Sequence, residues 1–382
     1  MTSMMLNRSA AMQSSLMRAS ASVPGRRALL AGTRKAPCTG AARRSGLATL
    51  HCSASQGKLA VITGGNTGLG KDSALEMAKK GYSVVLACRS AERAEKAAED
   101  IVRECKAAGV DPSVDTMLLD LANLASVKDF TSAFKSKYDK CDVLLNNAGV
   151  MAPPTRQLTA DGFEMQIGVN HLGHFALTAG MLQPLMAAPA ARIVNVSSVA
   201  HQLGTMNFDN LQSEGLFTYI PTMGWGAYGQ SKLANLLFTY ELHRLLRGAG
   251  ILTVDTNAVH PGVVDTELGR FLPLNFYPIM KRAGLIISPE EGARGQIRLC
   301  MDPTLTGVSG TYFAELSNEG KPGVHEKRRS NAASYNIPDA RRLWEMSEKL
   351  TDSKYDFTAA ATPVAAARGE GWMDAEAARN SI

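Results

Sequence analysis

Between a short apolar run and a longer amphipathic one, the chain reads Thr63-Gly64-Gly65-Asn66-Thr67-Gly68-Leu69-Gly70. Glycines let the backbone turn tightly and approach a phosphate closely, and the N-terminus of a following helix stabilises negative charge. The spacing is GxxxGxG rather than GxGxxG. Because this turn follows a predicted strand and opens a predicted helix, we interpret it as a nucleotide site. Its candidate residues are Gly64, Asn66, Thr67, Gly68, Leu69 and Gly70.

The same alternation of short and long segments continues along the chain. Predicted strands are Leu59–Thr63, Ser83–Cys88, Thr116–Asp120, Val143–Asn146, Arg192–Ser197, Thr253–Val259 and Gly310–Phe313. Predicted helices include Leu69–Lys80, Ala91–Ala107, Ser126–Tyr138 and Gly162–Leu185. Strands that read as continuous apolar runs are typical of a parallel sheet. The pattern predicts an α/β fold: one Rossmann-type, doubly wound parallel sheet of about seven strands with helices on both faces.

The end of the second predicted strand bears on which nucleotide binds. An acidic residue there would bond the adenosine 2′-hydroxyl, but the chain reads Ala87-Cys88-Arg89-Ser90 and has no carboxylate until Glu92. Arg89 suits a 2′-phosphate through planar, bidentate hydrogen bonds. We therefore favour NADP(H) over NAD(H), the alternative being a solvent-facing arginine at a helix start. Asp120 is a candidate acceptor for the adenine amino group.

Basic residues are concentrated at the N-terminus. The 382-residue chain has a net charge of +6, yet residues 1–57 hold eight Lys and Arg and no Asp or Glu. Removing these eight from 41 leaves 33 basic residues against 35 acidic ones, a net charge of −2. The remainder gives no argument for nucleic-acid binding. The leader is rich in Ser, Ala, Arg and Met, which is typical of an organelle transit peptide.

We expect residues 1–54 to be a disordered transit peptide, residues 55–350 one nucleotide-binding domain, and residues 351–382 a flexible tail. The stretch His51-Cys52-Ser53-Ala54-Ser55 favours a chloroplast over a mitochondrion, the alternative being a merely disordered tail. No uninterrupted apolar run of about 18 residues exists, so we predict no membrane span. Cysteine and histidine spacings predict neither a disulfide framework nor a metal site.

A second motif, Tyr228-Gly229-Gln230-Ser231-Lys232, lies in a segment whose leucines recur near helical spacing. A helix places Tyr228 and Lys232 on one face. A nearby cation favours tyrosinate and lowers the pKa of a phenol from about 10, toward the range of a general acid or base. On its own the pair is weak evidence, because an aromatic core residue beside a solvated lysine gives the same pattern.

Taken together, the motifs resemble the short-chain dehydrogenase/reductase superfamily over residues 58–350. Those that carry the resemblance are the glycine turn, Asn146-Asn147-Ala148-Gly149, Val169-Asn170-His171-Leu172-Gly173, Ser197-Ser198, the Tyr228/Lys232 pair, and Pro261-Gly262 followed by Thr266. Ala87-Cys88-Arg89, His174-Phe175 and Arg342-Leu343-Trp344-Glu345 are similar to the branch of retinol-dehydrogenase-like enzymes and protochlorophyllide reductases.

The resemblance implies roles for individual residues. Tyr228 would exchange a proton with the substrate oxygen, and Lys232 would lower the pKa of Tyr228 and bond the nicotinamide ribose. Ser198 would bond the substrate oxygen, and Asn170 would hold a water that relays protons to Lys232. Ser198 could instead be a strand-end cap, and Asn170 a locally bonded helix residue. The remaining cofactor candidates are Asn147, Pro261, Gly262, Val264 and Thr266.

The resemblance implies an NADP(H)-dependent oxidoreductase that acts on a carbonyl or alcohol of a small lipophilic substrate. An apolar segment, Phe271–Ile287, lies where the superfamily places its substrate lid and suggests peripheral membrane contact. One alternative is a light-dependent protochlorophyllide reductase, although Val263 stands where those enzymes carry a cysteine. Another is an NADPH-sensing regulatory subunit at the chloroplast envelope. The superfamily commonly assembles through its two long helices, whereas membrane-associated members of this branch can be monomeric. The expected states are therefore monomer or homodimer.

Overall fold

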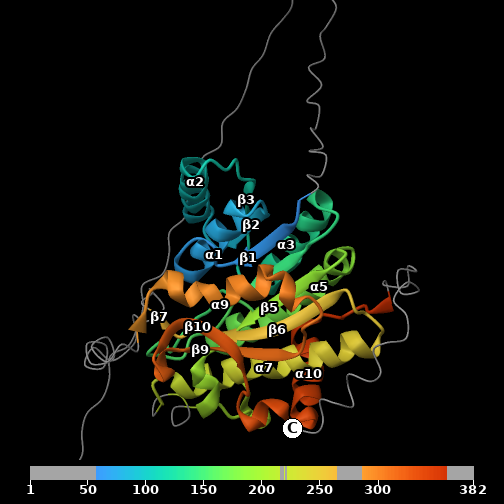
Figure 1. Ribbon diagram of the computed structural model, residues 1–382. Coiled ribbons are helices and arrows are strands. Elements are labelled where there is room, and N and C mark those ends of the chain that lie inside the picture. Colours follow the sequence, from blue (N-terminus) through green and yellow to red (C-terminus); the bar gives the residue numbers. More distant parts are fainter. Residues whose placement is uncertain (1–56, 216–218, 220–221, 265–285, 359–382) are drawn as a thin grey trace, which may run out of the picture. The chain divides into compact units, whose positions relative to one another are not determined.

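The computed structural model describes residues 57–215, 219, 222–264 and 286–358 (Figure 1). Its strands are β1 (Leu59–Thr63), β2 (Ser83–Cys88), β3 (Val114–Leu118), β4 (Val143–Asn146), β5 (Ala191–Val196), β6 (Val254–His260), β7 (Val263–Val264), β8 (Ile286–Ile287), β9 (Thr311–Leu316) and β10 (Lys321–Arg328). Its α-helices are α1 (Gly68–Lys79), α2 (Ala91–Ala107), α3 (Leu124–Lys137), α4 (Met165–Ile167), α5 (His174–Met186), α7 (Trp225–Gly248), α9 (Pro289–Met301) and α10 (Ile337–Thr351). A π-helical segment, η1 (Gly168–Gly173), joins α4 to α5, and a 3-10 helix, η2 (Val199–Leu203), follows β5.

Eight of these strands form one sheet in the order β10-β9-β6-β5-β4-β1-β2-β3. All the pairings from β3 to β9 are parallel, and β10 pairs antiparallel with β9. The central strands are buried along their whole length because helices cover both faces. This confirms the predicted doubly wound α/β fold.

Side chains of the central strands alternate between two cores. Val61 of β1 lies in the same core as Phe134 of α3 and Phe175 of α5. Its neighbour Ile62 lies in the opposite core with Met77 of α1. Helices α3, α5, α7 and α10 therefore cover one face of the sheet, and α1, α2 and α9 cover the other (Figure 1).

The direction in which strands are added reverses at β1. Strands β2 and β3 lie on one side of β1, whereas β4, β5 and β6 lie on the other. The connections that leave the carboxyl ends of β1 and β4 therefore run to opposite faces of the sheet. The crevice between their starting points is where open α/β sheets bind ligands. Thr63 ends β1 and Asn146 ends β4. The predicted nucleotide turn and the Asn147 loop thus meet at the switch point.

Several elements differ from the sequence prediction, among them the short strands β7 and β8, which were not predicted. β3 spans Val114–Leu118 rather than Thr116–Asp120. On this edge strand Leu118 is 61% exposed and Leu119, just beyond the strand, is 3% exposed, so the apolar run does not mark where the strand ends. β10 was not predicted, since its proline, glycine and charged residues are typical of an edge strand rather than a buried one. The predicted helix Gly162–Leu185 begins only at Met165 and is interrupted by η1.

The domain continues beyond residue 350, so the predicted start of the flexible tail is wrong. Tyr355 is buried, and its hydroxyl donates a hydrogen bond of 2.8 Å to the carbonyl oxygen of Phe175. Its ring centroid lies 4.5 Å from that of Trp344 on α10. An isolated tyrosine among polar residues carries no periodic signal, which is why the sequence did not predict this packing.

The expected transit peptide, residues 1–54, lies outside the described residues. None of the helices that the structure describes is both long enough and apolar enough to cross a bilayer.

Candidate active site

The β1–α1 turn is shaped for close approach of another group. Gly64 has a φ of +65°, which a side chain would strain. A Cβ atom on Gly70 would lie 2.4 Å from the Gly64 carbonyl oxygen and 2.6 Å from Nδ2 of Asn147. Thr67 precedes α1 without a side-chain cap, and the first turn holds no acidic residue. The free N–H groups and positive dipole end of α1 therefore fit the pyrophosphate of a dinucleotide.

The carboxyl end of β2 lies against this turn. Backbone N–H groups of Gly65 and Asn66 bond the thiol of Cys88, and burial raises the pKa of Cys88 to about 11. The next residue, Arg89, is exposed and makes no hydrogen bond or ion pair within the described part of the chain. Its guanidinium is thus free to bind a phosphate. Asp120 lies two residues beyond β3, where its Oδ1 accepts a backbone N–H at 3.0 Å.

Thr63 joins the turn to the loop after β4. Its Oγ1 accepts the backbone N–H groups of Asn147 at 2.9 Å and Ala148 at 3.0 Å. The Asn147 side chain in turn donates to the Thr63 carbonyl oxygen at 2.9 Å. Gln296 of α9 donates to Oδ1 of Asn147 at 3.3 Å and to Ser73 of α1 at 2.8 Å. Asn147, a predicted cofactor residue, therefore connects the end of β1 to α9 beneath the nucleotide turn.

Tyr228 and Lys232 lie on one face of α7, as predicted, with the Lys232 Nζ atom 5.7 Å from the Tyr228 ring centroid. Burial raises the pKa of Tyr228 to about 12, and a hydrogen bond with the Ser198 side chain offsets part of the rise. Burial also lowers the pKa of Lys232 to about 8. The net shift is upward, so the lowering of the Tyr228 pKa that we predicted from Lys232 is not seen in this arrangement. The Lys232 Nζ atom donates a hydrogen bond to the Val196 carbonyl oxygen at 3.0 Å.

The two serines after β5 have different tasks. Ser197 is buried, and its hydroxyl donates to the Lys232 carbonyl oxygen at 2.8 Å, which fastens β5 to α7. Ser198 caps η2, with its Oγ accepting the Ala200 N–H at 3.2 Å. The Ser198 side chain is also the one hydrogen-bonded to Tyr228. Ser198 is therefore both a strand-end cap and the serine beside the phenol.

Asn170 lies fully buried in η1. Its Oδ1 accepts the Val150 N–H at 2.8 Å, and its Nδ2 donates to the Val150 carbonyl oxygen and to Ser231 Oγ, both at 2.9 Å. A Cβ atom on Gly149 would lie 3.2 Å from Asn170 Oδ1 and 3.6 Å from Lys232 Nζ. Asn170 and Lys232 therefore converge on the Gly149 backbone. π-Helical turns of this kind often occur at functional sites.

The segment after β6 closes another side of the switch point. Pro261 is buried, and Gly262 has a φ of +93°. A Cβ atom on Gly262 would lie 3.0 Å from Oε2 of Glu315 on β9. Val264 is partly buried in β7. Thr266, the predicted partner of the nicotinamide carboxamide, lies outside the described residues.

Comparison with known proteins identifies the family. The short chain dehydrogenase family profile matches residues 58–210. Human retinol dehydrogenase 13 is 42% identical over 304 residues, which cover 77% of this chain and 84% of the human protein. Mouse retinol dehydrogenase 11 is 39% identical over 306 residues, covering 79% and 88%. The chain belongs to the short-chain dehydrogenase family.

Solved structures agree with this assignment. An uncharacterized protein from Mycobacterium paratuberculosis is 34% identical, with a TM-score of 0.61, over 78% of this chain and 95% of that one. A short chain dehydrogenase from Shigella flexneri 2a, complexed with NADP, is 21% identical with a TM-score of 0.53, over 67% and 96%, and shows the fold alone. As a short-chain dehydrogenase, the chain is an oxidoreductase of a family that uses NAD(P).

Two polar residues of the short-chain dehydrogenase site escaped the sequence analysis. Thr63 carried a usable signal, since a polar residue closing an apolar strand directly before a glycine turn invites a hydrogen-bonding role. Gln296 carried none, because only the packing of α9 against α1 brings it to Asn147. Among the described residues, no group of three or more His, Cys, Asp or Glu side chains could hold a metal ion.

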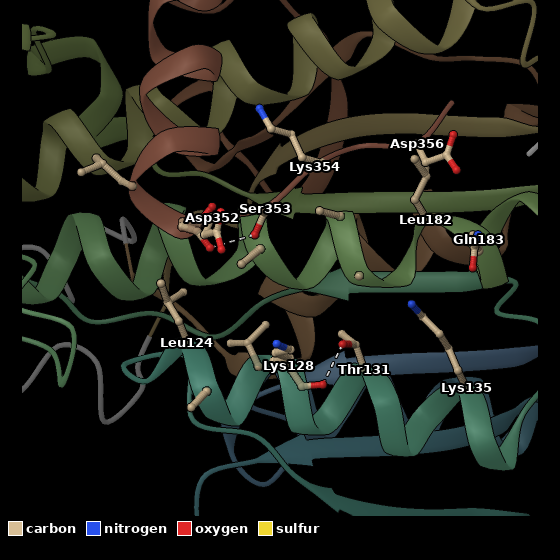
Figure 2. Close-up of a pocket in the computed structure, with 17 residues that line it drawn as sticks. Leu124, Lys128, Thr131, Lys135, Leu182, Gln183, Asp352, Ser353, Lys354 and Asp356 are labelled. Atoms are coloured by element: carbon tan, nitrogen blue, oxygen red, sulfur yellow. Dashed lines mark hydrogen bonds between the residues drawn. The ribbon is translucent and has the colours of Figure 1, made fainter. Parts of the chain in front are cut away.

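A groove of about 560 Å³ lies away from the dehydrogenase site (Figure 2). Leu124 and Lys128 of α3 form one wall, Leu182 of α5 lies beside them, and residues 350–356 form the other wall. None of the predicted site residues lines it.

Proposed function

We propose that this dehydrogenase transfers a hydride between NADPH and the carbonyl or alcohol carbon of a lipophilic substrate, with Tyr228 as the general acid and base. The observation that carries the proposal is the convergence of three side chains at the switch point. Ser198 and Lys232 both lie at Tyr228, and Lys232 also lies beside Gly149, in the loop that Thr63 joins to the nucleotide turn. A protein that only binds NADPH has no need of a buried phenol paired with a buried ammonium.

Bound nicotinamide would supply or accept the hydride. With its pKa raised by burial to about 12, Tyr228 stays protonated at neutral pH and can donate to a substrate oxygen as negative charge develops there. The Ser198 hydroxyl would bond the same oxygen. The Lys232 ammonium would bond the nicotinamide ribose, the other role that the resemblance implies for it. Asn170, which faces Lys232 across Gly149, would hold the water that returns the proton. A protonated phenol is the state that donates a proton during reduction of a carbonyl.

NADPH rather than NADH follows from the carboxyl end of β2. Arg89 is exposed beside the nucleotide turn and has no partner within the described residues. No carboxylate stands at Cys88, Arg89 or Ser90 to bond an adenosine 2′-hydroxyl or to repel a 2′-phosphate.

A lipophilic substrate is supported by the relatives and by the exposed surface near Ser198. The relatives at 42% and 39% identity are named as retinol dehydrogenases. Val199 and Leu203, which follow Ser198, are 49% and 89% exposed, and Met223, just before α7, is 59% exposed. Apolar side chains at such exposure suit contact with an isoprenoid chain or a membrane surface. The predicted lid, Phe271–Ile287, lies outside the described residues except at its last two positions.

The test is NADPH oxidation, followed by absorbance, with a panel of aldehydes and ketones that includes retinal. We expect the wild-type protein to reduce a lipophilic aldehyde faster with NADPH than with NADH. Tyr228→Phe should slow turnover by about 10²–10⁴-fold, the usual contribution of a general acid, and should leave NADPH binding intact. Tyr240→Phe is the matched control, because this phenol lies on the same helix and bonds Ser330 instead.

Each alternative has its own outcome in this assay. Protochlorophyllide turnover that needs light would replace the carbonyl proposal by the pigment reaction. NADPH binding without turnover of any carbonyl or alcohol would favour the regulatory subunit. Preference for NADH would contradict the role of Arg89.

The cellular and oligomeric proposals rest on separate observations. The acid-free leader is our reason to propose import into a plastid; fusion of residues 1–57 to a fluorescent protein tests it, and cytosolic fluorescence would contradict it. Helix α10 packs on α7 and α5. Helix α7 carries Tyr228 and is one of the helices through which the superfamily commonly assembles, monomer and homodimer being the two expected states. Because these helices are covered, we propose a monomer, which light scattering on the purified protein can test.

A further inference from the structure

His174 is a buried side chain to which the proposed mechanism assigns no role. It is the first residue of α5 and is 3% exposed. Its Nε2 lies 2.9 Å from Oγ1 of Thr63, at the end of β1, and its Nδ1 lies 3.2 Å from the carbonyl oxygen of Asn170. One imidazole therefore touches both the strand that leads into the nucleotide turn and the helix that carries the proposed proton relay.

The partners determine which ring nitrogen carries the proton. A carbonyl oxygen can only accept, so Nδ1 must donate to Asn170. Burial lowers the pKa of His174 to about 4, so the ring is neutral at physiological pH and Nε2 is an acceptor. The Thr63 hydroxyl must then donate to Nε2. The geometry thus defines a directed link in which Thr63 donates to His174 and His174 donates to Asn170.

On the cofactor side, this link orients the Thr63 hydroxyl. The hydroxyl has one proton and two lone pairs. With the proton directed at His174, both lone pairs can accept the N–H groups of Asn147 and Ala148. The competing acceptor is the Leu145 carbonyl oxygen, at 3.3 Å. His174 therefore keeps Thr63 in the orientation that holds the Asn147–Ala148 loop against the nucleotide turn.

On the proton-transfer side, the link continues to the catalytic helix. The Asn170 side chain donates to Ser231 Oγ at 2.9 Å, and the Ser231 hydroxyl donates to the Tyr228 carbonyl oxygen at 2.8 Å. Thr63, His174, Asn170, Ser231 and Tyr228 therefore form a continuous series of contacts from the nucleotide turn to the proposed general acid.

We propose that His174 is a positioning residue. Through its two ring nitrogens it couples the Asn147–Ala148 loop to Asn170 of η1 and, through Asn170, to α7. This inference rests on the proposed function. It predicts two separable effects. Loss of the Nε2 contact should weaken cofactor binding, and loss of the Nδ1 contact should slow the chemical step.

Two substitutions at His174 separate these contacts. In His174→Asn the amide nitrogen takes the place of Nδ1 and still reaches Asn170, whereas Thr63 loses its acceptor. In His174→Gln the amide oxygen takes the place of Nε2 and still accepts from Thr63, whereas the donor to Asn170 is lost. The Kd for NADPH, kcat, KM and the unfolding free energy are measured for both.

His171 provides the matched control. It lies in η1, is 1% exposed, and has its pKa lowered to about 3 by burial. Its Nε2 contacts Ser347 Oγ of α10 at 2.8 Å, away from the nucleotide turn. His171→Asn and His171→Gln should reduce stability as much as the His174 substitutions do. They should leave the Kd for NADPH, kcat and KM within about twofold of wild type.

For His174→Asn we expect about a tenfold rise in the Kd for NADPH, because the Thr63 hydroxyl can then turn to the Leu145 carbonyl oxygen and no longer directs both lone pairs at the Asn147–Ala148 loop. For His174→Gln we expect a nearly unchanged Kd and a fall in kcat of about 10–100-fold, as small misplacements of reacting groups produce. Thr63→Val also removes the acceptor of the Asn147 and Ala148 N–H groups, so it should raise the Kd at least as much as His174→Asn. Thr63→Ser should keep the wild-type affinity, and adding His174→Asn to Thr63→Val should raise the Kd little further.

The possible outcomes distinguish this inference from the proposed function. If wild type turns over a carbonyl with NADPH but the His174 variants behave like the His171 variants, the inference is wrong and the function stands. If His174→Asn and His174→Gln change Kd and kcat identically, the Nε2 and Nδ1 contacts of His174 do not have separate roles and the inference is wrong. If the His174 variants do not fold, an equal Kd for Thr63→Val and Thr63→Ser overturns the inference. A wild type without NADPH binding overturns both.

Discussion

The Nζ atom of Lys232 donates a hydrogen bond of 3.0 Å to the carbonyl oxygen of Val196, at the end of β5. The amide of Asn235, one helical turn further along α7, donates to the same oxygen at 3.1 Å. The ammonium is thus fixed between the sheet and the Tyr228 ring, and no carboxylate among the described residues forms an ion pair with it. A cation held in this way is useful for chemistry and costly for folding.

Lys232→Met should stabilise the protein at pH 7 and abolish turnover. The pKa of Lys232 is lowered from 10.5 to about 8 by burial, so between these values the native state binds fewer protons than the unfolded state. Stability therefore rises with pH through this window, and below it the full penalty applies, roughly 3 kcal/mol. Asn235 keeps the Val196 carbonyl paired in the variant. Denaturant unfolding at pH 7 and pH 10 measures the difference; a variant less stable than wild type at pH 7 would contradict it.

Arg89→Ala should weaken NADPH binding and leave NADH binding nearly unchanged. Charge-assisted hydrogen bonds to a phosphate contribute about 1.5–3 kcal/mol, which corresponds to a rise in Kd of about tenfold to a hundredfold. Fluorescence titration with each cofactor gives the two constants. Arg103→Ala is the control, because Arg103 lies on α2, the helix that begins just after Arg89, and pairs with Asp100. Equal effects of Arg89→Ala on both cofactors would rule out a 2′-phosphate contact.

Gly70→Ala should destabilise the protein and impair cofactor binding together. The new methyl group would meet the Gly64 carbonyl oxygen at 2.4 Å, and overpacking of this kind costs about 1–3 kcal/mol. Gly248→Ala, near the end of α7, meets nothing within 4 Å and should be neutral or stabilising by up to about 1 kcal/mol. Thermal unfolding and NADPH titration of the pair check this. A Gly70→Ala protein that binds NADPH normally would show that the turn has more room than it appears.

Acid should destabilise the fold below about pH 6.5. Burial lowers the pKa of His171 and His260 to about 3 and that of His174 to about 4, so all three are neutral in the native state. The unfolded chain takes up protons from about pH 6.5 downward, and stability falls until the native pKa is reached. Each histidine contributes up to about 1.4 kcal/mol per pH unit. Unfolding free energies at pH 7.5, 6 and 5 test this, and His171→Gln should reduce the slope by about one proton.

Much of the fold was predictable because its signals are local. Strand–helix alternation and the glycine turn between β1 and α1 require only neighbouring residues. The common face of Tyr228 and Lys232 follows from helical geometry over four residues. Edge strand β10 and the packing of Tyr355 were not predictable, because neither leaves a periodic pattern in the residues around it.

The sequence alone named most residues of the candidate site, as motifs at the ends of predicted strands and helices, but not Thr63 and Gln296. Their protonation and partners were decided by the tertiary structure. Burial, not the neighbouring lysine, sets the pKa of Tyr228. Packing assigns Ser197 to the helix backbone and Ser198 to the phenol, and His174 meets Thr63 across 111 residues of chain. Local geometry fixes which way a side chain points, but its loss of water and its hydrogen-bond partners depend on segments far apart in the sequence that only the folded chain brings together.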